Sequence, residues 1–302
     1  MPAFPYVLMV GGFVRSRYAL LFGQDFEGIT HNSSLPLPFE SKLDVMDIKI
    51  LIAAHKKAQM PKDDMYLPVH VGKALSNQDF GYAADNTGDN ISDKNPYMCE
   101  LTALYWGWKN LPNEYIGLVH YRRHFTCRFG RWKFGLIIKR AEMERRLATC
   151  DVILPVKRYY IIETLYSHYK HTHDVAHLEV AREAIQTICP EYLETFDRVM
   201  DRRSGHMFNM MVMRRPILDS YCQWLFSILF EMEKGVDFSS LTPFDARWPG
   251  RVAELLLDVW ITHNKIKYQE VGMVMLGNEN FLAKLKGFLA AKYFGIKYNR
   301  SK

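Results

Sequence analysis

From Asp47 onward, short β-rich apolar runs alternate with stretches of helical spacing. The apolar runs are IKILIAA (48–54), YIGLVHY (115–121), DVILP (151–155) and GHMFNMMVM (205–213). Helical spacing of apolar residues is found in 98–110, 141–150, 163–189, 216–235 and 251–264. This alternation predicts an α/β fold in which helices flank a mixed, mostly parallel central sheet.

The two ends of the chain differ from this middle part. Residues 1–45 contain paired glycines and the run THNSSLPLPFESK and show little periodicity, and Met46 opens the first strand. We expect an N-terminal extension over 1–45, a single domain over 46–278 and a separate C-terminal segment over 279–302. For the extension, two interpretations stay open: it precedes the true start at Met46 or is poorly ordered, or it is a short amphipathic segment packed on the domain or a membrane surface.

Composition excludes several classes of protein. No run approaches the roughly 18 uninterrupted apolar residues of a membrane-spanning helix, and the apolar N-terminal stretch lacks the features of an export signal. The five cysteines are scattered without a CxxC pair, which favours a reducing cytoplasm over a disulfide framework. The net charge of +6 arises from 39 basic and 33 acidic residues, so it does not by itself indicate a nucleic-acid partner.

Several familiar sites are missing from the sequence. There is no GxGxxG after the first strand, no GxxxxGK[ST] and no GxSxG. The histidines of SHYKHTHDVAH do not have the spacing of a zinc motif and have no evident carboxylate or thiolate to complete a site. We therefore interpret them as a polar helix edge, solvated or facing the substrate, in which His171 and His173 are the candidates for acceptor binding.

The most distinctive feature is the cluster at the end of YIGLVHYRRHF. An apolar strand ends there in His120, Tyr121, Arg122 and Arg123, and the end of such a strand is where an open α/β sheet places its ligand. Two guanidinium groups can neutralise a diphosphate through bidentate hydrogen bonds without a metal. Because neighbouring residues of a strand face opposite sides, Arg122 is the first choice and Arg123 the second. Alternatively, both are surface charges or partners of buried carboxylates.

Seven sequence motifs, which follow one another along the chain, cover most of its length. They are DIKILIAAHKK, YLPVHVGKAL, DNTGDNISDKNPYMCELTALYWGWKN, YIGLVHYRRHF, DVILPVKRYYIIETLYSHYKHTHDVAHL, GHMFNMMVMRRPILDSYCQWLFSILFEME and RVAELLLDVWITHN. From Met46 on, the sequence resembles a bacterial family catalogued as a domain of unknown function and assigned to glycosyltransferases of capsule, exopolysaccharide and O-antigen gene clusters. The resemblance implies a GT-A-like fold and transfer of a sugar, galactose or galactofuranose among the plausible ones, from a nucleotide donor, most simply a UDP-sugar.

Within that frame, donor-binding roles follow for polar residues near the strand ends. The expected donor contacts are His55, Lys56, Asp89, Asn90, Ser92, His120, Tyr121, Arg122, Arg123, His206 and Asn209. For Asp89 and Asn90 the alternative is turn formation, since DNTGDN is rich in turn residues. For His206 and Asn209 the alternative is a hydrogen-bonded pair in the core.

An inverting transferase also needs a carboxylate that deprotonates the acceptor hydroxyl. Glu254 is the first choice, because it lies at the start of a helix after a glycine-containing loop and matches an acid of the family motif. Asp258, one turn later on the same face, is the second candidate and Asp245 the third. Each of the three acids has a helix-end or surface charge as its alternative.

The cofactor and the location follow from the same resemblance. The cationic strand end implies that no metal is required, and Mg or Mn held by the acids of DNTGDN is the alternative. Phenylalanines and leucines alternate with lysines in 279–302, which suits an anionic membrane surface. We thus expect a cytoplasmic enzyme, peripheral on the inner membrane face, with a polyprenyl-diphosphate-linked glycan as acceptor and no nucleic-acid partner. A non-catalytic module that binds polysaccharide or nucleic acid is the competing hypothesis.

Overall fold

The computed structural model describes residues 45–127 and 133–276. The predicted C-terminal segment 279–302 and all but the last residue of the predicted extension 1–45 lie outside these ranges. The central sheet has eight strands in the order β3-β2-β1-β4-β5-β10-β6-β9, with a further pairing between β4 and β9. Its strands are β1 (Ile48–Ala54), β2 (Tyr66–His70), β3 (Ala83–Ala84), β4 (Tyr115–His120), β5 (Arg123–Thr126), β6 (Val152–Pro155), β9 (Met211–Arg214) and β10 (Gln269–Met275).

The sheet is mixed, with six of its eight described strands running in the same direction. Pairings β1–β2, β1–β4, β2–β3 and β6–β10 are parallel. Pairings β4–β5, β4–β9, β5–β10 and β6–β9 are antiparallel. Strands β5 and β9 run against the other six, because β5 folds straight back from β4 and β9 returns along β4. Neither reversal has a signal in the apolar pattern.

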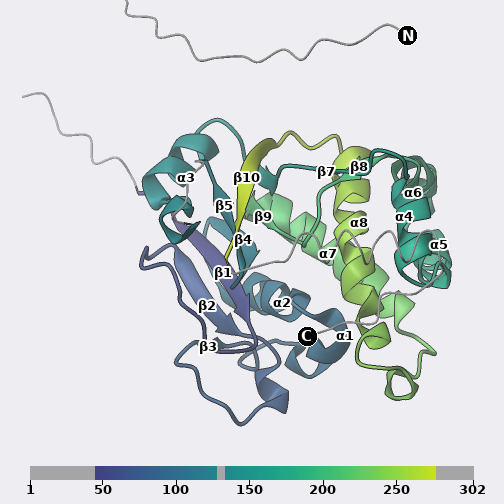
Figure 1. The fold of residues 1–302 in the computed structure, drawn as a ribbon, viewed down its shortest axis with the longest axis horizontal. Helices are drawn as coiled ribbons and strands as arrows, with labels where there is room; N and C mark the ends of the chain where they lie inside the picture. The colour runs from purple at the N-terminus through teal and green to yellow at the C-terminus, as the bar shows by residue number, and fades with distance from the viewer. Residues whose placement is uncertain (1–44, 128–132, 277–302) are drawn as a thin grey trace, which may run out of the picture. The chain divides into compact units, whose positions relative to one another are not determined.

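Helices cover both faces of the sheet. They are α1 (Asn95–Met98), α2 (Leu101–Asn110), α3 (Arg140–Leu147), α4 (Leu165–Thr172), α5 (Ala176–Ile188), α6 (Leu193–Met200), α7 (Arg215–Met232) and α8 (Trp248–His263). Within β1, Leu51 packs into a core formed with α2, α7 and α8, whereas Ile50 and Ile52 pack into a second core with α3. The two cores follow from the period-2 alternation of strand side chains. Figure 1 shows α4, α5 and α6 grouped on the far side of α8 from β1–β3.

Two predicted elements are interrupted. The helix expected over 163–189 is divided into α4 and α5, because the Asp174 side chain accepts the N–H of Ala176 at 3.0 Å and starts a new helix. The strand expected over 205–213 is β8 (Ser204–Gly205), paired with β7 (Arg158–Tyr159), and then β9, with an irregular segment between them. In that segment Phe208 and Asn209 adopt positive φ angles of 77° and 50°.

No helix in the described ranges combines the length and the apolar character that crossing a bilayer demands.

Strands β4 and β9 approach each other so closely at Gly117 that a side chain there has no room. A Cβ atom there would lie 2.8 Å from the carbonyl oxygen of Met211 and 2.8 Å from Cγ2 of Val212, whereas one at Gly135 would meet nothing within 4 Å. We expect Gly117→Ala to lower the free energy of unfolding by about 1–3 kcal/mol through overpacking, and Gly135→Ala to change it by less than about 0.5 kcal/mol. Denaturant unfolding of the two variants measures this, and equal effects would contradict it.

Candidate functional site

The carboxyl ends of the parallel strands β1 and β4 carry a cationic cluster around Tyr121. The His55 ring lies 5.2 Å from the Tyr121 ring, and the Lys56 ammonium and the Arg122 guanidinium lie 5.6 and 5.2 Å from it. Burial, followed by the charges of Lys56 and Arg122, lowers the pKa of His55. Four residues that the sequence singled out therefore meet at one edge of the sheet, which we call the donor edge (His55, Lys56, Tyr121 and Arg122).

The two neighbouring arginines point to different places, because the chain turns at Tyr121 and Arg122 between β4 and β5. Arg122 is exposed and lies over Tyr121. Arg123 opens β5, and its guanidinium lies 4.4 Å from the centre of the Phe208 ring. Arg122 belongs to the donor edge, whereas Arg123 faces the segment that joins β8 to β9.

The DNTGDN loop is held by its own hydrogen bonds. Buried Asp85 accepts the backbone N–H groups of Gly72 at 2.8 Å and Lys73 at 3.0 Å, and the Ser92 hydroxyl also donates to it. Asp89 accepts from the Tyr105 hydroxyl at 3.1 Å, and the Asn90 amide donates to Gly88. The local bonds of Asn90 match the turn-forming alternative, whereas the Asp89 carboxylate contacts Tyr105 and Lys109 of α2. Within the described residues, none of these contacts joins Asp89, Asn90 or Ser92 to the donor edge.

Two carboxylates one turn apart on α8 hold the irregular segment 206–209. Glu254 Oε2 accepts the backbone N–H of Phe208 at 2.9 Å. Asp258 Oδ2 accepts the backbone N–H of His206 at 2.8 Å, and its Oδ1 lies 2.5 Å from His206 Nδ1. The side chains of Glu254 and Asp258 thus replace the sheet partners that a continuous strand would have offered.

The same segment is fixed from its other side by the ends of β4 and α2. His120 Nε2 donates to the Phe208 carbonyl at 2.6 Å. The Asn209 amide donates to Glu100 Oε1 at 2.8 Å and to the Gly250 carbonyl at 3.0 Å. Because non-glycine residues rarely adopt positive φ angles, this set of bonds is what keeps Phe208 and Asn209 in their conformation.

His206 and Asn209 lie in the core, with 0% of their surface exposed. The second ring nitrogen of His206 is 3.2 Å from Glu270, so both nitrogens face carboxylates. Both residues are hydrogen-bonded in the core, as the alternative had it, but to Asp258, Glu270, Glu100 and Gly250 and not to each other. Asp258 is 2% exposed, and both of its oxygens contact His206, which makes it a structural partner.

Glu254 also borders a pocket of about 250 Å³. Its lining includes Arg158, Tyr160, His168, His173, Phe208 and Arg251. His173, a predicted acceptor contact, is in this wall, and burial followed by the charge of Arg251 lowers its pKa to about 3, so its imidazole is neutral. Asp245 is exposed and accepts from Thr242 at the surface, outside this lining.

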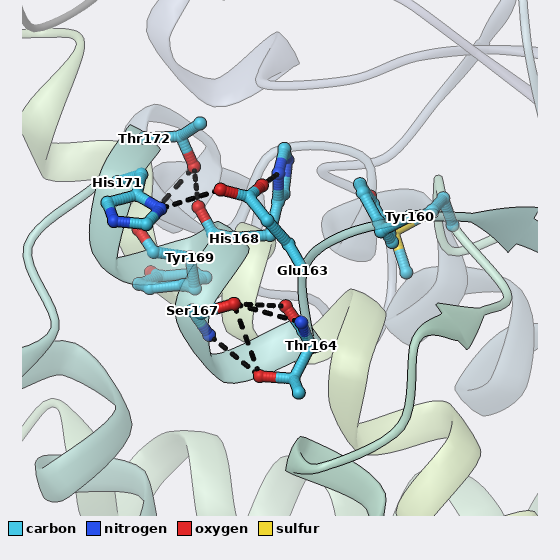
Figure 2. Close-up of polar contacts among 9 residues, drawn as sticks. Tyr160, Glu163, Thr164, Ser167, His168, Tyr169, His171 and Thr172 are labelled. Atoms are coloured by element: carbon cyan, nitrogen blue, oxygen red, sulfur yellow. Dashed lines mark hydrogen bonds and ion pairs between the residues drawn. The ribbon is translucent and has the colours of Figure 1, made fainter. Parts of the chain in front are cut away.

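The other predicted acceptor contact, His171, has a different partner. Figure 2 shows the buried Glu163 carboxylate between two imidazoles, with His168 Nδ1 at 2.8 Å and His171 Nδ1 at 2.7 Å. Thr164 and Ser167 form a capping box directly below, which starts α4. Glu163 thereby fixes the ring of His168, which lines the pocket, whereas His171 is outside the lining.

Electrostatics distinguishes Glu254 from the other acids. Burial, followed by the nearby Glu100, raises the pKa of Glu254 to about 7, although the Phe208 N–H, Arg123 and Arg158 act in the opposite direction. A carboxyl with this pKa exchanges its proton near neutral pH, as a general base must. The charge of Arg247 contributes to lowering the pKa of His55, and the Glu254 carboxylate contributes to raising the pKa of Arg247.

Sequence reasoning missed Glu100, Arg158, Arg247 and Arg251. Arg158 follows the strand DVILP just as the arginine pair follows YIGLV, so the same strand-end argument would have found it. Arg247 and Arg251 precede and begin a helix whose sequence has no distinguishing signal. In the described ranges, no group of three or more histidine, cysteine, aspartate or glutamate side chains is arranged to hold a metal ion.

Comparison with known proteins agrees with the α/β prediction. A solved structure, the apo form of the bifunctional glycosyltransferase WbbM, is similar with a TM-score of 0.69 and 31% sequence identity. The similarity covers 78% of this chain and 46% of that one, so this chain matches about half the length of WbbM. No curated protein matches this sequence.

A family model, described as a domain of unknown function (DUF4422), matches residues 49–265. That range contains the donor edge, the segment 206–209 and the pocket beside Glu254. Since it makes up more than half of the chain, the protein belongs to the DUF4422 family.

Proposed function

We propose that the protein is a glycosyltransferase that moves a sugar from a nucleotide-diphosphate donor to a hydroxyl of a glycan acceptor. The observation that carries this proposal is Glu254, a carboxyl with a pKa of about 7 in a pocket next to a cationic strand end. Similarity to part of a bifunctional glycosyltransferase supports the same reaction class.

The donor edge would bind the diphosphate. Arg122 and Lys56 are cations at the carboxyl ends of β4 and β1, where α/β sheets bind ligands. As the bond from the anomeric carbon to the diphosphate breaks, negative charge accumulates on the leaving group, and guanidinium hydrogen bonds stabilise it. This arrangement needs no metal, and Mg or Mn is the alternative. The donor we expect is a UDP-sugar, galactosyl or galactofuranosyl among the plausible ones.

Glu254 would act as the general base. One of its oxygens is fixed by the Phe208 N–H at 2.9 Å, and the other accepts no hydrogen bond from the described residues. That oxygen would take the proton of the acceptor hydroxyl while the hydroxyl oxygen bonds to the anomeric carbon and the diphosphate leaves. The configuration at the anomeric carbon is then inverted.

The acceptor and the location rest on the sequence resemblance. We propose a polyprenyl-diphosphate-linked glycan in capsule, exopolysaccharide or O-antigen synthesis, and a GT-A-like enzyme that works in the cytoplasm on the inner membrane face. His173 and Tyr160 line the pocket beside Glu254 and are the side chains we propose to contact this glycan.

Removing the Arg122 guanidinium should weaken donor binding. We expect Arg122→Ala to reduce the affinity for a nucleoside diphosphate or the matching nucleotide sugar by about tenfold to a hundredfold, the usual range for a charged hydrogen bond. The measurement is a thermal-shift titration over a nucleotide-sugar panel, with and without chelator, and Arg145→Ala on the exposed face of α3 serves as control. Binding that requires a divalent ion and survives Arg122→Ala would refute the metal-free diphosphate site.

Substituting the base should stop transfer but not donor binding. Glu254→Gln retains an oxygen that accepts the Phe208 N–H, so we expect the fold and the nucleotide-sugar affinity to persist while transfer falls by about a hundredfold or more. Asp258→Asn should instead lower the free energy of unfolding, because it disturbs a buried pair with His206. Transfer activity in Glu254→Gln close to that of the unmodified protein would exclude Glu254 as the base.

The raised pKa of Glu254 predicts how rate and stability depend on pH. Transfer should fall as the pH drops through about 7, because the protonated carboxyl cannot accept a proton. Between pH 4.5 and about 7 the folded protein holds a proton that the unfolded chain has released, so the stability of the native protein relative to Glu254→Gln should decline as the pH rises through this window. Rate profiles and denaturant unfolding at several pH values measure both, and a rate that is flat from pH 5 to 8 would contradict the assignment.

A further inference from the structure

Exposed apolar side chains concentrate in one short segment of the molecule. Seven large apolar residues are exposed in the described ranges, and four of them lie between positions 156 and 162. Val156, Tyr159, Ile161 and Ile162 have 50%, 73%, 85% and 63% of their surface exposed. We call these four the apolar tip. Single exposed apolar residues are ordinary, whereas a cluster of large ones marks an interaction surface.

Backbone hydrogen bonds hold the apolar tip in place. β7 pairs with β8 through Arg158 opposite Gly205 and Tyr159 opposite Ser204. The Tyr160 N–H donates to the Arg203 carbonyl at 2.7 Å, and the Arg203 side chain donates to the Ile161 carbonyl at 3.2 Å. Beyond the tip, the buried carboxylate of Glu163 is bonded to His168 and His171 (Figure 2). The isoleucines are thus presented to solvent by an ordered scaffold.

Cations surround the apolar tip. Arg158, Arg202, Arg203 and Lys265 have no carboxylate within ion-pair distance among residues 45–127 and 133–276. A pocket of about 480 Å³ beside β7 is lined by Lys157, Arg202 and Lys265 together with the hydroxyl-bearing residues Ser204, Thr262 and Tyr268. Of the acids nearby, Asp258 is bonded to His206, and Glu270 contacts both Lys157 and His206. Asp258 also lines this pocket, but both of its oxygens are bonded to His206. Lys157 is paired with Glu270, so Arg202 and Lys265, with the neighbouring hydroxyls, are the groups that suit a phosphate-bearing headgroup.

We propose that the apolar tip and these cations form a docking surface for an anionic lipid membrane. Isoleucine and tyrosine side chains enter the boundary between headgroups and acyl chains, while lysine and arginine side chains at the same level attract anionic headgroups. A second copy of the chain would bring the same cations together. Residues 279–302 contain six basic residues and one acid, so their charge does not complement this surface.

The docking surface and the pocket beside Glu254 share one wall. Side chains alternate along β7, so Lys157 lines the cationic pocket whereas Arg158 and Tyr160 line the pocket with Glu254. If the proposed transferase function holds, docking brings the acceptor pocket to the lipid surface, where a lipid-linked acceptor is carried. The docking surface itself requires no catalysis.

Vesicle binding by the full chain tests the proposal. Cosedimentation is measured with phosphatidylcholine vesicles, with and without phosphatidylglycerol, for the unmodified protein, for Ile161→Ser/Ile162→Ser and for Arg202→Gln/Lys265→Gln. Leu75→Ser, at an apolar side chain 61% exposed on the 3-10 helix Lys73–Leu75, and Lys170→Gln, at an exposed position at the end of α4, are the matched controls. Protein without vesicles corrects for aggregation.

We expect the substitutions Ile161→Ser/Ile162→Ser to lower vesicle affinity by about tenfold or more, because two large apolar side chains that would contact lipid are removed. In Arg202→Gln/Lys265→Gln, vesicle binding should lose most of its dependence on phosphatidylglycerol. Both control variants should bind vesicles like the unmodified protein. The proposal would be overturned if Ile161→Ser/Ile162→Ser bound vesicles as well as the control variants do. It would also be overturned if the unmodified protein bound no vesicles and the double isoleucine variant lost self-association instead. Transfer to a water-soluble acceptor, measured in parallel, should be unchanged in the isoleucine variant, so failure of docking and failure of the transferase function are distinguishable.

Discussion

The site depends on two carboxylates that lie one turn apart on α8 and bind alternate backbone N–H groups of a neighbouring segment. Glu254 holds Phe208, and Asp258 holds His206. Their spacing along the helix axis, about 6 Å over four residues, is close to the distance between alternate residues of an extended chain, about 6.6 Å. A helix can therefore serve as the partner of an extended segment, and the sheet loses a strand pairing at the point where the site forms.

The two carboxylates then differ in their surroundings, and this difference separates a structural role from a chemical one. Asp258 contacts the imidazole of His206 through one oxygen and the backbone through the other, so its charge is compensated inside the core. Glu254 has one backbone bond and a second acid, Glu100, nearby, and its pKa rises to about 7. Desolvation and the presence or absence of a partner thus give two carboxyl groups of the same helix different surroundings.

How much of this was predictable from the sequence depends on the range of the interaction. The donor edge follows from strands whose polar residues begin where the apolar run stops, a local pattern, so His55, Lys56, Tyr121 and Arg122 could be grouped in advance. The segment 206–209 could not be read in this way. It has the composition of a strand, but its partners lie 46 and 52 residues away, and the positive φ angles of Phe208 and Asn209 depend on those partners. For the same reason His206 and Asn209 resembled ligand contacts, although the structure gives both of them protein partners.

The short ribbon β7–β8 borders both pockets. Strand β7 follows β6 directly in the chain and pairs only with β8 among the described residues, so the ribbon is separate from the main sheet. In and next to β7, Lys157 lines one pocket and Arg158 and Tyr160 line the other, as expected for side chains that alternate along an extended chain. Any displacement of this ribbon moves both linings together. Because β8 leads into the segment held by Glu254 and Asp258, the carboxylates of α8 also determine where the ribbon stands. The lining of the pocket beside Glu254 and the exposed isoleucines therefore belong to one continuous stretch of chain, next to the segment that Glu254 and Asp258 hold.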